Sequence, residues 1–128
     1  MKIRILGNSI RLRLTKSEVR DFLVTGKVKE VIKFGPPSFK QLTYYVQKAD
    51  IPLLQANYGL NEISILIPSL AAEKWASSDQ ISLENQMVIG KGEYLKILIE
   101  KDFKCLKSRV GEDETDMFPH PSEDSTNK

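Results

Sequence analysis

Two short runs of alternating apolar and polar residues open the chain, and the pair Gly7-Asn8 separates them. The runs cover residues 1–6 and 9–14. A Gly-Asn pair suits the positive φ angles of a two-residue turn, so the pattern predicts a β-hairpin. The facing apolar pairs are then Ile5 with Ile10 and Ile3 with Leu12.

The other side of this hairpin carries four cationic side chains, which we call the cationic quartet: Lys2, Arg4, Arg11 and Arg13. The predicted register sets Arg4 opposite Arg11 and Lys2 opposite Arg13. Like charges that face each other on a sheet repel, at a cost of about 0.2–1 kcal/mol per pair. The quartet is therefore expected to be neutralised by acidic side chains of the chain or by an anionic ligand, or else to extend into solvent.

A helix is predicted directly after the hairpin. Thr15 and Glu18 have the spacing of a capping box, in which each side chain accepts from the other residue's backbone amide. Val19 and Phe22 follow at helical spacing, and Gly26 suits the left-handed residue that ends a helix.

The remaining pattern predicts more strands and one more helix. Residues 27–34 and 41–49 alternate and are expected to form a second hairpin, whereas residues 50–61 are typical of an irregular connection. A strand at 62–67 precedes a short helix that follows Pro68 and ends near Ser77, with Trp75 as a core or edge anchor. A last hairpin, 81–89 with 95–99, is expected to turn through three residues at 90–92.

These elements predict one α+β domain over residues 1–106, with a mainly antiparallel sheet of six or seven strands and two short helices. Residues 107–128 have little apolar content and are predicted to form an acidic C-terminal extension that is partly disordered. Its acidic segment comprises Glu112, Asp113, Glu114 and Asp116. One interpretation is a solvated tail. The other is a strap with the acidic segment near the cationic quartet, anchored by Met117, Phe118 and the stiff Pro-His-Pro stretch at 119–121.

Composition adds limits to this picture. The chain has 128 residues, 41% hydrophobic and 28% charged, as in an ordinary soluble protein, and its longest apolar run is too short to cross a bilayer. One cysteine excludes an internal disulfide and fits a cytoplasmic location. Residues 1–34 hold nine basic and three acidic side chains, so positive charge gathers near the start.

Few chemical functions have support in the sequence. Cys105 and His120 match no zinc pattern, the acidic segment matches no calcium loop, and no cofactor motif is present. No nucleophile motif is present either, so an enzyme is the minority interpretation. Nucleic-acid binding is an alternative, with Lys29, Lys33 and the quartet on one sheet face and Tyr45 as a stacking side chain.

Two stretches resemble a family of uncharacterised small bacterial proteins. They are residues 7–19, GNSIRLRLTKSEV, and a C-terminal set: Cys105, Leu106, Arg109, Glu112, Asp113, Glu114, Asp116, Phe118 and Pro119. The resemblance covers nearly the whole chain and implies a stand-alone protein of the Bacteroidota type without an assigned activity.

The sequence thus predicts a cytoplasmic binding module. Its quartet would receive an anionic small molecule or an acidic protein segment, in competition with the chain's own acidic segment. The alternatives are a small phosphate-handling enzyme, whose arginines would work with a divalent ion held by the acidic segment, and a nucleic-acid-binding protein.

Overall fold

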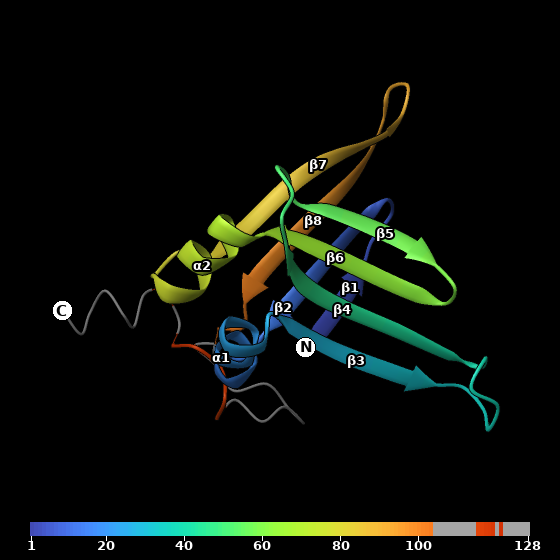
Figure 1. Cartoon of the computed structure of the whole chain (residues 1–128), viewed down its shortest axis with the longest axis horizontal. Coiled ribbons are helices and arrows are strands. Elements are labelled where there is room, and N and C mark those ends of the chain that lie inside the picture. Colours follow the sequence, from blue (N-terminus) through green and yellow to red (C-terminus); the bar gives the residue numbers. More distant parts are fainter. Residues whose placement is uncertain (104–114, 120, 122–128) are drawn as a thin grey trace.

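A computed structural model gives the fold, and the structure describes residues 1–103, 115–119 and 121 (Figure 1). Within these residues the chain forms two helices and eight strands. In chain order they are β1 (Lys2–Ile5), β2 (Ser9–Leu14), α1 (Lys16–Thr25), β3 (Lys27–Lys33), β4 (Gln41–Ala49), β5 (Gln55–Gly59), β6 (Glu62–Pro68), α2 (Ser69–Ser77), β7 (Ser82–Gly90) and β8 (Glu93–Lys101).

The strands form two sheets of four. Sheet A has the order β1-β2-β8-β7, and sheet B has the order β3-β4-β6-β5. The two strands of each hairpin are antiparallel. At the centre of each sheet the pairing is parallel, β2 with β8 in sheet A and β4 with β6 in sheet B. The α+β class is confirmed. The strands form two sheets of four instead of the predicted single sheet of six or seven, and each sheet is mixed, with antiparallel hairpins and a parallel central pair. The parallel pairings join strands from distant parts of the chain, which local patterns do not specify.

The two halves of the chain repeat one arrangement. Each half runs strand, strand, helix, strand, strand, and the first hairpin of each half joins the second hairpin of the other half. Phe22 in α1 and Trp75 in α2 occupy equivalent positions in their helices and meet edge to face, with ring centroids 6.2 Å apart. The two helices lie together at one end of the molecule (Figure 1).

The core lies between the sheets and under the helices. Alternate residues of the four central strands point into it and are fully or almost fully buried, as are the inward side chains of both helices. Burial of about 1.5–3 kcal/mol per large apolar side chain is the main stabilising contribution. The fully buried strand residues are Leu12, Leu14, Val46, Ile65, Ile67, Ile97 and Ile99.

The first hairpin and its helix form as predicted. The Leu6 amide donates to the Ser9 carbonyl at 3.2 Å across the turn. Gly7 takes a φ of 56°, whereas Asn8 does not take the positive φ expected for both residues of the pair. The capping box of Thr15 and Glu18 is present, and Gly26 ends α1 in the left-handed conformation. Local turn and cap chemistry therefore specifies this part of the fold.

Residues 50–61 differ from the prediction, because Gln55–Gly59 forms strand β5 against β6. The turn between these strands is Leu60-Asn61, where both residues take positive φ, 51° and 61°. Leucine rarely adopts this conformation, and Leu60 is 99% exposed, so no apolar contact holds it there. Sequence patterns do not predict this turn, because its first position, Leu60, holds a leucine where glycine or asparagine is usual.

The last hairpin has the predicted register, but its turn differs from the predicted one. Leu83 faces Ile99 and Met87 faces Leu95, as a three-residue loop would require. The turn has only Lys91 and Gly92, however, and a bulge between Val88 and Gly90 supplies the extra residue. The predicted loop length is therefore wrong, although the facing pairs are correct.

Candidate anion-binding site

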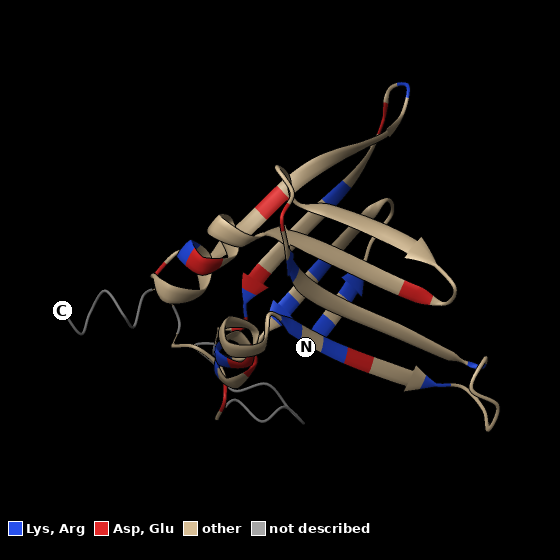
Figure 2. Ribbon diagram, viewed as in Figure 1, with Lys and Arg blue, Asp and Glu red and all other residues tan. Residues whose placement is uncertain are grey.

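The cationic quartet lies on the outer face of sheet A, which faces away from the core. The backbone register pairs Lys2 with Arg13 and Arg4 with Arg11, as predicted. The alternate residues of β2, which include Leu12 and Leu14, are buried in the core. The strand period therefore holds all four cations on one side, and Figure 2 shows them on β1 and β2.

Strand β8 brings an acidic residue beside two of these arginines. Its parallel pairing with β2 sets Glu100 opposite Arg13, and Glu100 Oε1 lies 2.7 Å from Arg13 Nε and 3.3 Å from Arg11 Nε. The Arg13 guanidinium donates a hydrogen bond to this oxygen. One carboxylate therefore offsets part of the repulsion between the two cations.

Lys2 has a different acidic partner. Its Nζ lies 3.1 Å from Oδ2 of Asp102, a side chain that is only 1% exposed. The geometry is that of an ion pair and not of a hydrogen bond. Sequence patterns missed Asp102, because it follows the end of β8 and its proximity to β1 depends on how the sheet is assembled.

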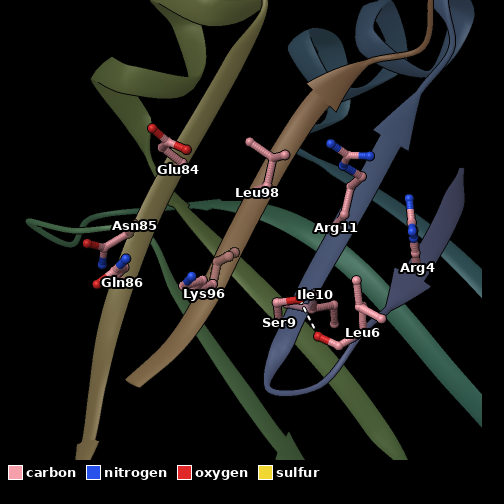
Figure 3. Close-up of a pocket in the computed structure, with 11 residues that line it drawn as sticks. Arg4, Leu6, Ser9, Ile10, Arg11, Glu84, Asn85, Gln86, Lys96 and Leu98 are labelled. Carbon is pink, nitrogen blue, oxygen red and sulfur yellow. Dashed lines mark hydrogen bonds between the residues drawn. The ribbon is translucent and has the colours of Figure 1, made fainter. Parts of the chain in front are cut away.

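Arg4 remains the member of the quartet with no acidic partner among the described residues. Its side chain is exposed and borders a concave region of about 550 Å³ on the outer face of sheet A. Figure 3 shows this concavity, with Arg4 and Arg11 on one side and Glu84 on the other. Its lining residues with outward side chains include Arg4, Ser9, Arg11, Glu84, Gln86, Lys96 and Leu98.

The acidic segment is only partly described. Glu112, Asp113 and Glu114 lie outside the described residues, as does the predicted domain boundary after residue 106. Asp116 binds the N-terminus of α1, where the Ser17 amide donates to Oδ1 at 3.2 Å and the Ser17 hydroxyl donates to Oδ2. This carboxylate thus stabilises a helix end, where negative charge is favourable.

Residues next to Asp116 anchor this piece of chain to the domain. Met117 is buried, and the Phe118 amide donates to the Asp102 carbonyl at 2.8 Å. The Phe118 ring packs against Phe103 with centroids 5.8 Å apart. Met117 and Phe118 therefore act as the anchors that the strap interpretation predicted.

The carboxylate of Asp116 gives this attachment a pH dependence. Hydrogen bonds from the Ser17 and Thr15 hydroxyls lower the pKa of Asp116 below its ordinary value of 3.8. A lowered folded-state pKa contributes stability above pH 3.8, and that contribution is lost as pH falls through the folded-state pKa.

Asp116→Asn is therefore expected to lower the thermal midpoint at pH 6, and the difference from the wild type should close in acid. Thermal unfolding followed by circular dichroism between about pH 6 and pH 2 measures the gap. Ser17→Ala should shrink it, and a gap independent of pH would contradict the assignment.

The other basic candidates lie on a different surface. Lys29 and Lys33 belong to β3 in sheet B, and Tyr45 in β4 has Lys27 Nζ 4.1 Å from its ring centroid. The prediction that these lysines share one sheet face with the cationic quartet is therefore wrong, since that face requires strands of two separate sheets.

Metal and membrane sites have no support in the described part of the chain. No group of three or more potential metal ligands occurs there, and Cys105 and His120 lie outside it. None of its helices has the length and apolar character that a membrane span needs.

Fold and site together define a small α+β protein with two repeated halves and a basic concavity on the outer face of one sheet. The chain belongs to a family of unknown function, DUF7009, whose model matches residues 1–122. This confirms the predicted membership of an uncharacterised family, whereas the Bacteroidota origin stays a prediction. No curated protein and no solved structure matches the chain.

Proposed function

We propose that the protein is a binding module that takes a small anionic ligand on the outer face of sheet A. The observation that supports this most is Arg4, which directly faces Arg11, borders the concavity and has no acidic partner among the described residues. An anion between two facing guanidinium groups would remove their repulsion and receive charge-assisted hydrogen bonds.

The charge around the concavity also favours an anion. Five cationic side chains share this face with three carboxylates: Lys2, Arg4, Arg11, Arg13 and Lys96 with Glu84, Glu100 and Asp102. Guanidinium groups match phosphate and carboxylate oxygens in a bidentate geometry, so groups of these two kinds are the ligand chemistry that the face suits.

Charge-removing substitutions test this proposal, with inorganic phosphate and pyrophosphate as probes in calorimetric titrations. Arg4→Gln is expected to weaken binding about tenfold, the equivalent of one charged hydrogen bond. Lys29→Gln on sheet B removes the same charge from another face and should leave the affinity unchanged. Equal affinity in Arg4→Gln and the wild type, or an equal loss in Lys29→Gln, would overturn the proposal.

The chain's own acidic segment is proposed to compete for this face. Because Asp116 binds α1 and Met117 is buried, deletion of residues 107–128 would also remove structural contacts. The sharper test neutralises only Glu112, Asp113 and Glu114, as Gln, Asn and Gln. Competition predicts tighter phosphate binding in this triple variant, and unchanged affinity would exclude it.

A further inference from the structure

A row of four side chains crosses the outer face of sheet A from one edge strand to the other. The registers place Arg4 opposite Arg11, Arg11 beside Leu98, and Leu98 opposite Glu84. All four line the concavity, and Figure 3 shows them in this order from β1 to β7. The row therefore has a cationic end, an apolar middle and an anionic end.

The two charged ends are too far apart to neutralise each other. Neighbouring strands lie about 4.8 Å apart, so β2 and β7, with β8 between them, are separated by roughly 10 Å. Glu84 is exposed and has no cationic partner among the described residues. Lys96, in the next row opposite Gln86, forms no ion pair with Glu84. Glu84 and Arg4 thus present opposite, unpaired charges to one concavity.

Glu84 also limits which anions fit. A polyphosphate long enough to reach from Arg4 to β7 would place its far end against the Glu84 carboxylate, and like charges at such a contact are unfavourable. A short anion would use the arginine end alone. A ligand that uses the whole row needs a cationic group at the Glu84 end and an apolar segment over Leu98.

We infer that the ligand is a small zwitterion: a phosphate or carboxylate group at Arg4 and Arg11, an apolar spacer along Leu98, and a primary amine at Glu84. This inference rests on the proposed anion-binding function and adds the class of ligand. The amine donates charge-assisted hydrogen bonds to the Glu84 carboxylate, as the anion accepts them from the arginines.

Two matched probes separate the amine contact from the anion contact. Aminohexyl phosphate carries both charges on a six-carbon spacer, and hexyl phosphate lacks only the amine. Calorimetric titration of the full chain is expected to give about tenfold tighter binding of aminohexyl phosphate, as for one charge-assisted hydrogen bond. Glu84→Gln should abolish this preference and leave hexyl phosphate binding unchanged or slightly stronger. Arg4→Gln should weaken both probes.

Glu62→Gln is the control, since Glu62 is an exposed carboxylate on β6 of sheet B. It should retain the preference for the amine. Equal affinities of the wild type for the two probes would overturn the zwitterion inference and leave anion binding standing. If the Glu84→Gln variant still preferred aminohexyl phosphate over hexyl phosphate, the inference would be overturned as well. Absence of phosphate-dependent binding, or binding of both probes insensitive to Arg4→Gln, would overturn the proposed function itself.

Discussion

Replacement of Trp75 by alanine is expected to lower the free energy of unfolding by about 3–5 kcal/mol, the range for large aromatic side chains in cores. Trp75 is fully buried in the core that both sheets and both helices share. Its ring meets Phe22 edge to face, and its indole N–H donates to the Ile81 carbonyl at 2.9 Å. Alanine would leave a cavity at the contact between the helices and would remove the donor to Ile81.

Urea unfolding followed by circular dichroism measures this loss of stability. Two further variants separate the contribution of the indole N–H from that of the buried volume and provide a control. Trp75→Phe keeps most of the apolar volume but removes the N–H. The Ile81 carbonyl would still accept from the Lys101 amide at 3.2 Å, so a smaller loss of about 0.5–1.5 kcal/mol is expected, the contribution of one hydrogen bond. Leu70→Ala changes an exposed residue of the same helix and should stay within about 0.5 kcal/mol of the wild type. A loss below about 1 kcal/mol in Trp75→Ala would contradict the described core.

The parts of the fold that follow from the sequence are those that local chemistry determines. Gly7 provides the positive φ of the first turn, Thr15 and Glu18 start α1, and Gly26 ends it. Each of these devices works within a few residues of chain. The register of the first hairpin follows from its turn, so the arrangement of the cationic quartet was predictable as well.

The parts that did not follow depend on contacts between distant segments. The parallel pairing of β2 with β8 joins the first hairpin to the last, and no turn or alternation pattern specifies it. Strand β5 was missed for a local reason, because Leu60 occupies a turn position that favours glycine or asparagine. The repeat of two halves is visible only once the hairpins are paired.

The same distinction applies to the candidate site. Its cations were predictable from alternation, but the concavity and the partners Glu100 and Asp102 require the assembled sheet. The acidic partner of Arg11 and Arg13 is Glu100 of β8. Asp116 of the acidic segment instead accepts a hydrogen bond from the Ser17 amide at the N-terminus of α1. Charge asymmetry along the chain predicted a basic surface, and the pairing of strands determines which carboxylates lie beside it.

Glu100 provides a test that links the site to the fold, because its removal should change stability and anion binding in opposite directions. The carboxylate lies between Arg11 and Arg13, and its side chain is mostly buried. Glu100→Gln keeps an acceptor for Arg13 but loses the negative charge, so the unfolding free energy should fall by about 1–2 kcal/mol. The same change removes the negative charge that offsets Arg11 and Arg13, and Arg11 lines the concavity, so phosphate should bind about three- to tenfold more tightly.

Urea unfolding and phosphate titration of one preparation measure both effects. Glu84→Gln is the matched control for stability, since it removes an equal charge from the same face at a carboxylate without a cationic partner among the described residues. It should remain within about 0.5 kcal/mol of the wild type. In the double variant Arg13→Gln/Glu100→Gln the stability losses should be less than additive, because each single change already breaks the pair. If Glu100→Gln lowered stability without tightening phosphate binding, Glu100 would be only a structural partner of Arg13, and the anion would not depend on Arg11. Lower stability together with tighter phosphate binding would instead show that Glu100 and the bound anion compete for the same arginines.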